Sequence, residues 1–190
     1  MRNAILKLWD FVDRTGIDQL KYFLETSDFF DAPCSTEFHL SRPGGLMKHS
    51  MNVFDLLEEK VRRYGLDSTI PLETRIICAL GHDLCKTNFY VRGTKNVKEN
   101  GVWKEKQVWT VKDQFPMGHG EKSASILQDF ITLTEMEKLA IRWHMVAFDP
   151  GIHFFYPSGS AFRTAVNKHP LVTLLFTADY EASQILEASE

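Results

Sequence analysis

The segment TRIICALGHDLCK, residues 74–86, places a histidine and an aspartate side by side in an apolar run. A run of this kind predicts a buried helix. Burying His82 and Asp83 there costs free energy unless each side chain finds a polar partner or a bound ion. Two explanations are therefore open at this stage: the pair is satisfied by itself and the backbone, or it holds a ligand.

Apolar residues recur at helical spacing through most of the chain. Residues 4–16 and 17–30 predict two helices separated at Gly16. A third helix is predicted from about Leu46 to near Gly65, and a fourth from Pro71, which suits a first helical turn. Further helices are predicted for residues 120–131, 132–148 and 169–188, with Thr134 and Glu137 forming a capping box. Residues 158–169 are predicted to form a loop.

One segment breaks the helical pattern. Residues 88–112 carry β-branched and aromatic side chains on both sides of Asn100-Gly101, a dipeptide typical of tight hairpin turns. The sequence therefore predicts an all-α, mainly helical fold with one inserted β-hairpin around residues 88–112. We expect a single domain over residues 1–190, with the N-terminal helices of residues 1–30 packed on it.

Charge and composition narrow the function classes. The formal net charge of -3 argues against binding a polyanion by bulk charge, although it leaves room for a local basic patch. No apolar run approaches the roughly 20 residues that span a bilayer, so no membrane association is expected. Three cysteines, Cys34, Cys78 and Cys85, make a disulfide framework improbable and favour a reducing cytoplasm.

Several more polar residues fall near helix ends or on apolar helix faces. Each alone is more often a hydrogen-bonded core residue or a cap than a ligand. Together they lie on five separate predicted helices, which favours a shared site. Imidazole and carboxylate groups suit Zn, Mn, Fe, Co or Ni, and the chain has no Cys-x-x-Cys for a closed structural zinc site. The candidate ligands are His49, His82, Asp83, His119, His144 and Asp179.

The order of these residues resembles that of the HD-domain metal-dependent phosphohydrolases. The segments GGLMKHSMNVFDLL, ALGHDLCKT and FTADYEAS carry the resemblance, which covers most of the chain. MGHGEKSASIL and RWHMVAF are similar to the subgroup with two further histidines, and the chain also resembles the HD domain of bacterial exoribonucleases that degrade RNA from its 3′ end. It departs at Phe176, where many relatives have a histidine.

The resemblance implies a set of ligands and roles. His49, His82, Asp83 and Asp179 would hold a first metal ion, and Asp83 would bridge to a second ion held with His119 and His144. One or two divalent ions (Mn, Fe, Ni, Co or Zn, with Mg as a further option) would serve hydrolysis of a phosphate mono- or diester. Asp83 and Lys86 are the expected catalytic residues, and Lys86, Arg142 and Arg163 are the expected phosphate-binding residues. A solvated lysine at a helix end explains Lys86 about equally well, and arginines such as Arg142 and Arg163 are more often simply solvated.

The expected substrate is a phosphorylated small molecule, a nucleotide or short oligonucleotide. Two alternatives share the fold: an exonuclease-like enzyme acting on nucleic acid, and a non-catalytic HD module that senses a metal or nucleotide. A hydrolase using the thiol of Cys34 or Cys85 is a further alternative, since Lys86 beside Cys85 would lower its pKa. The sequence predicts no oligomeric state.

Overall fold

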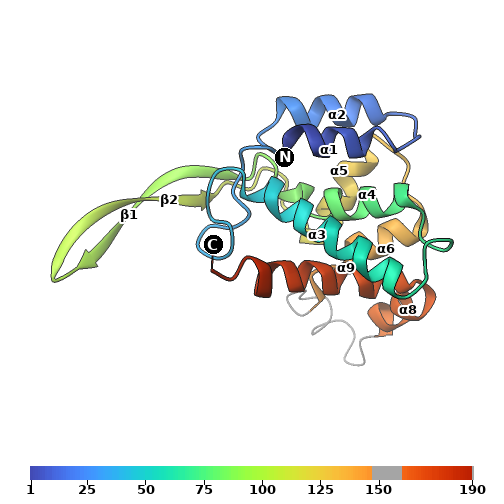
Figure 1. Cartoon of the computed structure of the whole chain (residues 1–190). Coiled ribbons are helices and arrows are strands. Elements are labelled where there is room, and N and C mark those ends of the chain that lie inside the picture. The colour runs from blue at the N-terminus through green and yellow to red at the C-terminus, as the bar shows by residue number, and fades with distance from the viewer. Residues whose placement is uncertain (147–159, 190) are drawn as a thin grey trace.

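The computed structural model describes residues 1–146 and 160–189 and is mainly helical, with a two-stranded antiparallel hairpin (Figure 1). The mainly helical fold class predicted from the sequence is therefore confirmed. The strands are β1 (Tyr90–Glu99) and β2 (Val102–Val111). The helices are α1 (Arg2–Trp9), α2 (Ile17–Thr26), α3 (Gly45–Arg63), α4 (Leu72–Gly81), α5 (His119–Gln128), α6 (Glu135–Trp143), α8 (Ser160–Lys168) and α9 (Pro170–Glu181). Two short turns complete the list, the 3₁₀ turn η1 (Leu84–Lys86) and the π-helical turn η3 (Ala182–Leu186).

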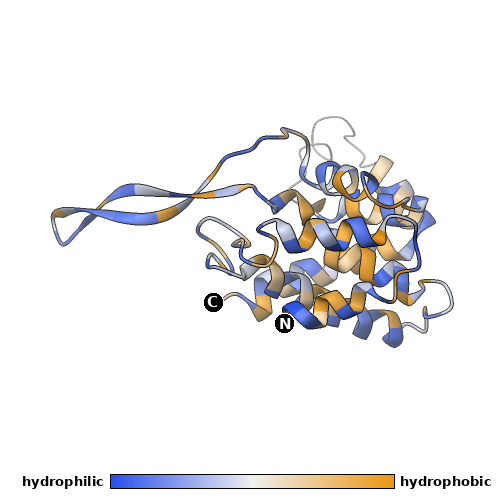
Figure 2. Cartoon of the chain, turned by 90° about the horizontal axis from the view of Figure 1, so that it is seen from above, coloured by the Kyte–Doolittle hydropathy of each residue, from blue (hydrophilic) through white to orange (hydrophobic). Residues whose placement is uncertain are grey.

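The helices surround one apolar core. α3 packs against α4 and α9, α6 packs against α9 and α5, and α1 and α2 lie across α4 on one side (Figure 1). Ile5 and Trp9 of α1 and Leu20 and Leu24 of α2 are fully buried in the same core as the other helices. Figure 2 shows that the apolar faces of these helices turn inward, as burial of an amphipathic stripe requires.

The first predicted helix is shorter than expected, because α1 ends at Trp9 instead of reaching residue 16. The chain then turns back to start α2 after Gly16, which has a positive φ of 95°. A Cβ at Gly16 would lie 1.8 Å from the carbonyl oxygen of Phe130, so this turn also needs glycine for space. Both features are tertiary and leave no periodic signal in the sequence.

The prediction of a loop at residues 158–169 is wrong over most of its length, because Ser160–Lys168 form helix α8. Ala165 of this helix is buried, and the ring of Phe162 packs 5.8 Å from that of Trp143 in α6. The segment is rich in small and polar residues, so its amphipathic stripe is recognisable only when its packing partner is known.

Helices α6 and α9 also end earlier than predicted, as do α2 at Thr26, α4 at Gly81 and α5 at Gln128. The capping box of Thr134 and Glu137 at the start of α6 is confirmed. α6 ends at Trp143, so His144 follows the helix instead of lying within it, and residues 147–148 of the predicted helix lie outside the described residues. The last helix ends at Glu181, where the π-helical turn η3 redirects the chain toward α3.

The hairpin forms as predicted. Glu99 pairs with Val102 across the two-residue turn, in which Asn100 and Gly101 have φ of 51° and 83°. These are the left-handed values that a type I′ turn requires. The two strands project from the helical body as an isolated ribbon with a largely hydrophilic surface (Figures 1 and 2).

No helix in the two described segments combines the length and the apolar character that crossing a bilayer demands.

Candidate metal centre

The six histidines and aspartates singled out in the sequence meet in one buried cluster between the helices. Three of the ligand candidates sit directly beside helix ends: His82 follows α4, His144 follows α6 and His119 begins α5. The other histidine, His49, lies on α3, and Asp179 lies on α9. The packing of α3 against α4 and α9, and of α5 against η1 and α6, brings these positions together.

Asp83 lies at the middle of the cluster. Its Oδ2 is 3.6 Å from Nε2 of His49 and 3.5 Å from Nε2 of His82. Its Oδ1 is 2.6 Å from Nε2 of His119 and 3.6 Å from Nε2 of His144. The two oxygens of one carboxylate therefore face two different pairs of histidines.

Asp179 closes the cluster on the α9 side. Its Oδ1 is 3.1 Å from Nε2 of His49 and 3.9 Å from Nε2 of His82. Asp179 also shares a compact group of metal-ligating atoms with His82 and His144. The described residues thus contain overlapping groups of donors, all of which meet near Asp83.

Backbone carbonyls fix the orientation of two histidines. Nδ1 of His82 lies 2.8 Å from the carbonyl oxygen of Ala79, and Nδ1 of His144 lies 2.7 Å from that of Ile141. Each histidine directly follows a helix, so a helix-end carbonyl three residues earlier is free to accept from its ring. Nδ1 must then carry the proton, which leaves Nε2 with a lone pair aimed into the cluster.

Nε2 of His144 is fully buried and has no hydrogen-bond partner among the residues that the structure describes. A buried polar atom without a partner costs free energy, and a nitrogen lone pair in this position fits a metal ion. Burial lowers the pKa of His82 to about 4, against the opposing effect of Asp83, so this ring is neutral at neutral pH as a ligand must be.

A carboxylate that sequence reasoning missed orients His49. Glu187 lies just beyond η3, is fully buried, and accepts from Nδ1 of His49 at 3.0 Å and from Nδ2 of Asn52 at 2.8 Å. Carboxylate-histidine pairs of this kind are typical around bound metal ions. The available signal was weak: Glu187 lies eight residues after Asp179, about two helical turns.

Three carboxylates surround the cluster: those of Asp83 and Glu187 are buried, and that of Asp179 is partly buried. Burial alone would raise each pKa, yet nearby cationic and hydrogen-bonding groups hold all three pKa values below their usual range, so all are ionised. Lys86 contributes one positive charge beside these carboxylates, and its Nζ lies 2.7 Å from Oδ2 of Asp83. Burial alone would lower the pKa of His49, but the surrounding negative charge raises it. The same excess of negative charge suits a divalent cation.

A cavity of about 810 Å³ opens beside the cluster and reaches Asp83, Lys86 and Asp179. Apolar and aromatic side chains form much of its remaining wall, on the loop before α3, directly after α6 and on α9. These wall residues are Phe38, Met145, Phe176 and Tyr180. The volume lies within the range of small-molecule binding sites.

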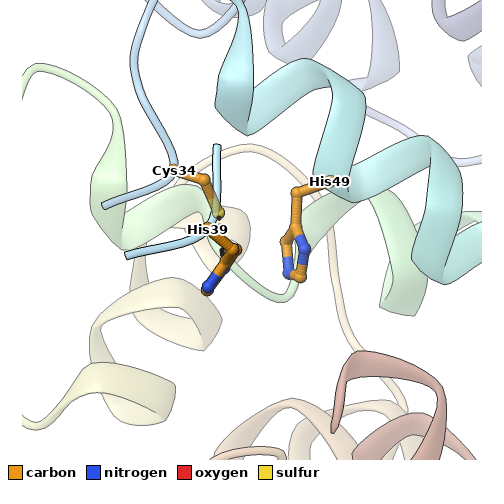
Figure 3. Close-up of side chains that lie close together, drawn as sticks. All are labelled: Cys34, His39 and His49. Atoms are coloured by element: carbon orange, nitrogen blue, oxygen red, sulfur yellow. Dashed lines mark hydrogen bonds between the residues drawn. The ribbon is translucent and has the colours of Figure 1, made fainter. Parts of the chain in front are cut away.

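A loop before α3 adds Cys34 and His39 to the edge of the cluster, as Figure 3 shows beside His49. Nε2 of His39 lies 3.3 Å from Sγ of Cys34 and 3.9 Å from Oε2 of Glu187. His39 also lines the cavity.

The cysteines are poor nucleophiles. Burial raises the pKa of Cys34, and it raises that of Cys85 to about 12. The expectation of a lowered pKa for Cys85 is therefore wrong: the Lys86 ammonium does lower it, but desolvation outweighs this effect. Both thiols stay protonated at neutral pH, which removes the physical basis for a thiol hydrolase.

The three cations expected to bind phosphate lie in different places. Lys86 is at the cluster, with Nζ also 3.4 Å from Sγ of Cys34. Arg142 pairs with Glu121 at 2.5 Å and stacks on Trp143, and Arg163 is exposed on α8. Of the three, Lys86 alone is among the residues that line the cavity.

The donor set fits a divalent transition metal. Its members are imidazole nitrogens and carboxylate oxygens, and two of the rings are held with Nε2 as acceptor. One of these nitrogens is buried without a hydrogen-bond partner in residues 1–146 and 160–189. No known family model, curated protein or solved structure matches the chain.

Proposed function

We propose that the chain is a metal-dependent phosphohydrolase of the HD-domain type. One observation carries the proposal: Asp83 stands between two pairs of histidines, with a different carboxylate oxygen facing each pair. A bridging carboxylate between two donor sets is the arrangement that a two-metal hydrolase needs. The resemblance of the ordered motifs to HD-domain enzymes supports the same reading.

The residues divide between two neighbouring metal positions that share Asp83. His49, His82 and Asp179 belong to the first, and His119 and His144 to the second. Bound divalent ions, among Mn, Fe, Ni, Co, Zn or Mg, would polarise a phosphoryl oxygen and lower the pKa of a water molecule.

The remaining groups act on the substrate directly. Lys86 brings an ammonium to the point where the cavity meets Asp83. Burial alone would lower the pKa of this lysine, but the neighbouring Asp83 carboxylate raises it well above its usual range. A permanently charged Lys86 would bind a phosphoryl oxygen at the cluster. The aromatic side chains of Phe176 and Tyr180 provide an apolar wall that favours a substrate with a base or another flat apolar group. A nucleotide or the end of an oligonucleotide meets both requirements.

Metal analysis and a generic assay test the proposal together. We expect the purified protein to bind Mn or Ni and then to hydrolyse bis(p-nitrophenyl) phosphate or p-nitrophenyl phosphate. Asp83→Ala should abolish hydrolysis, because it removes the only carboxylate that faces both pairs of histidines in the described residues. His144→Ala should lower the metal content from about two ions to about one.

His169→Ala is the matched control, since His169 lies at the start of α9 and contacts Glu135 instead of the cluster. It should retain metal content and activity. A wild-type protein that neither binds these ions nor hydrolyses either ester would refute the proposal. Full activity in Asp83→Ala would show that the reaction occurs elsewhere.

A further inference from the structure

The projecting hairpin carries charge opposite to that of the rest of the molecule. Residues 90–111 contain five lysines and arginines and two glutamates, a net charge of +3 in a chain whose total is -3. Most of their side chains are exposed. Trp103, near the tip, is 67% exposed, which is unusual for so large an apolar side chain unless it serves binding.

The strand register sorts the hairpin residues onto two faces. Residues directly opposite each other share a face, so Arg92 with Trp109 and Lys98 with Trp103 lie on one face. We call this the tryptophan face. On it, the guanidinium of Arg92 lies 3.7 Å from the centre of the Trp109 ring, and Nζ of Lys98 lies 6.0 Å from that of Trp103.

Polar groups fill the space between these two cation-aromatic pairs. Thr94 pairs with Gln107 and Asn96 pairs with Glu105, and all four belong to the tryptophan face. The six-residue separation of Arg92 from Lys98 places the two aromatic platforms about 20 Å apart along the strand. The face therefore presents stacking groups, cations and hydrogen-bonding side chains over a length that matches several nucleotides.

The base of the hairpin reaches the metal centre. Tyr90 is the first residue of the tryptophan face and lies four residues after Lys86. Its hydroxyl donates to the carbonyl oxygen of Cys34 at 3.3 Å. Lys95, on the opposite face, pairs at 3.3 Å with Glu37, which lines the cavity beside the cluster. A strand bound along the hairpin would therefore end at this cavity.

We propose that the tryptophan face binds single-stranded nucleic acid and directs one end of the strand toward the cavity. Bases stack readily on tryptophan rings and on arginine guanidinium planes, and lysines attract the phosphates. An unpaired strand suits this face better than a duplex does, because only unstacked bases can lie against the aromatic rings. The binding step stands by itself, and the delivery of a strand for cleavage rests on the proposed phosphohydrolase function.

The test compares two neighbouring exposed side chains on opposite faces. Trp103→Ala removes a stacking platform, and Val102→Ala removes a similarly exposed apolar group (60%) from the other face. Binding of a fluorescent single-stranded oligonucleotide to metal-free protein is measured by anisotropy. We expect Trp103→Ala to raise Kd about tenfold and Val102→Ala to leave it nearly unchanged.

A second variant, which keeps both tryptophans, controls for disruption of the hairpin by Trp103→Ala. Lys98→Gln keeps a long side chain on the tryptophan face and should reduce the slope of log Kd against log salt by about 0.7. If wild-type protein does not bind the strand, binds a duplex equally well, or responds alike to Trp103→Ala and Val102→Ala, the inference is wrong.

Hydrolysis of bis(p-nitrophenyl) phosphate separates this inference from the proposed function. Because the small ester does not reach the hairpin, both tryptophan-face variants should hydrolyse it at the wild-type rate. If the ester is hydrolysed but Trp103→Ala does not raise the Kd for the oligonucleotide, the binding surface is refuted and the enzymatic function is not. The Trp103 effect without hydrolysis would refute the enzymatic function alone.

Discussion

At the scale of single residues, the cluster depends on which ring nitrogen of each histidine carries the proton. For His82 and His144 the choice is made by backbone carbonyls, which no substitution removes. For His49 it is made by the side chain of Glu187. Glu187 is therefore the residue through which the orientation of a ligand histidine can be tested without touching the ligand.

Glu187→Gln should weaken metal binding by about tenfold to a hundredfold. The amide keeps the shape of the side chain but loses the charge that favours a proton on Nδ1 of His49, and with it the lone pair on Nε2. The measurement is the Kd for Mn or Ni by titration calorimetry. Glu181→Gln is the control, because Glu181 pairs with Lys60 outside the cluster. Equal affinities in the two variants would contradict a positioning role for Glu187.

At the scale of elements, the centre is assembled by the close approach of α5 to the end of α6. A Cβ on Gly120 would lie 2.3 Å from the carbonyl oxygen of Arg142 and 2.6 Å from that of Ile141. The second of these carbonyls accepts from Nδ1 of His144. Gly120 thus lets His119, its neighbour, lie with its ring 5.2 Å from that of His144.

Gly120→Ala should force α5 away from α6 and separate the His119 and His144 side of the cluster from Asp83. We expect loss of about one bound ion of two, and a fall in the free energy of unfolding of about 1–3 kcal/mol. Metal analysis and urea unfolding measure the two effects. Ser125→Ala, on the same helix, should change neither. Unchanged metal content in Gly120→Ala would mean that the contact between α5 and α6 does not position the ligands.

The contrast between the predicted and observed elements has a physical origin. His82, Asp83 and Asp179 could be found because they interrupt apolar runs of the sequence, where burying a polar group costs free energy unless it has a partner. Glu187, Asn52 and α8 lie in segments where polar residues are ordinary, and the spacing of Glu187 from Asp179 is too weak a signal to identify it. The hairpin could be placed from its turn dipeptide and the β-branched and aromatic residues beside it, since both signals are local. Contacts between segments that are distant in the chain could not be predicted from the sequence.

At the scale of the whole molecule, a buried ionic network joins the N-terminal helices to the helices that carry the ligands. Arg14, between α1 and α2, donates to both oxygens of Glu137 at 2.8 Å and to Glu73 at 3.2 Å. Thr74 of α4 donates to the same Glu137 at 2.8 Å. Glu137 is fully buried on α6, so its charge depends on these partners.

Arg14→Met should lower the free energy of unfolding by about 3–5 kcal/mol at neutral pH, because it leaves Glu137 as an unpaired buried charge. The double variant Arg14→Met with Glu137→Met should lose less free energy of unfolding than the two single variants lose in sum, since the charge is removed together with its partner. Arg62→Met is the control: Arg62 makes an exposed pair with Glu58 and should cost about 0–1 kcal/mol.

The acid dependence of this loss provides the sharper measurement. Burial alone raises the pKa of Glu137, but hydrogen bonds from Arg14, the Thr134 amide and Thr74 lower it below its ordinary value of 4.5. The stabilisation is therefore fully present above about pH 4.5 and is lost as the pH falls through the lower value of the folded protein. In Arg14→Met burial prevails and Glu137 takes up its proton at higher pH. The difference between wild type and Arg14→Met in urea unfolding should thus be largest at neutral pH and narrow toward about pH 4. A difference that stays constant over this range would mean that Arg14 stabilises the fold by packing and not by its charge.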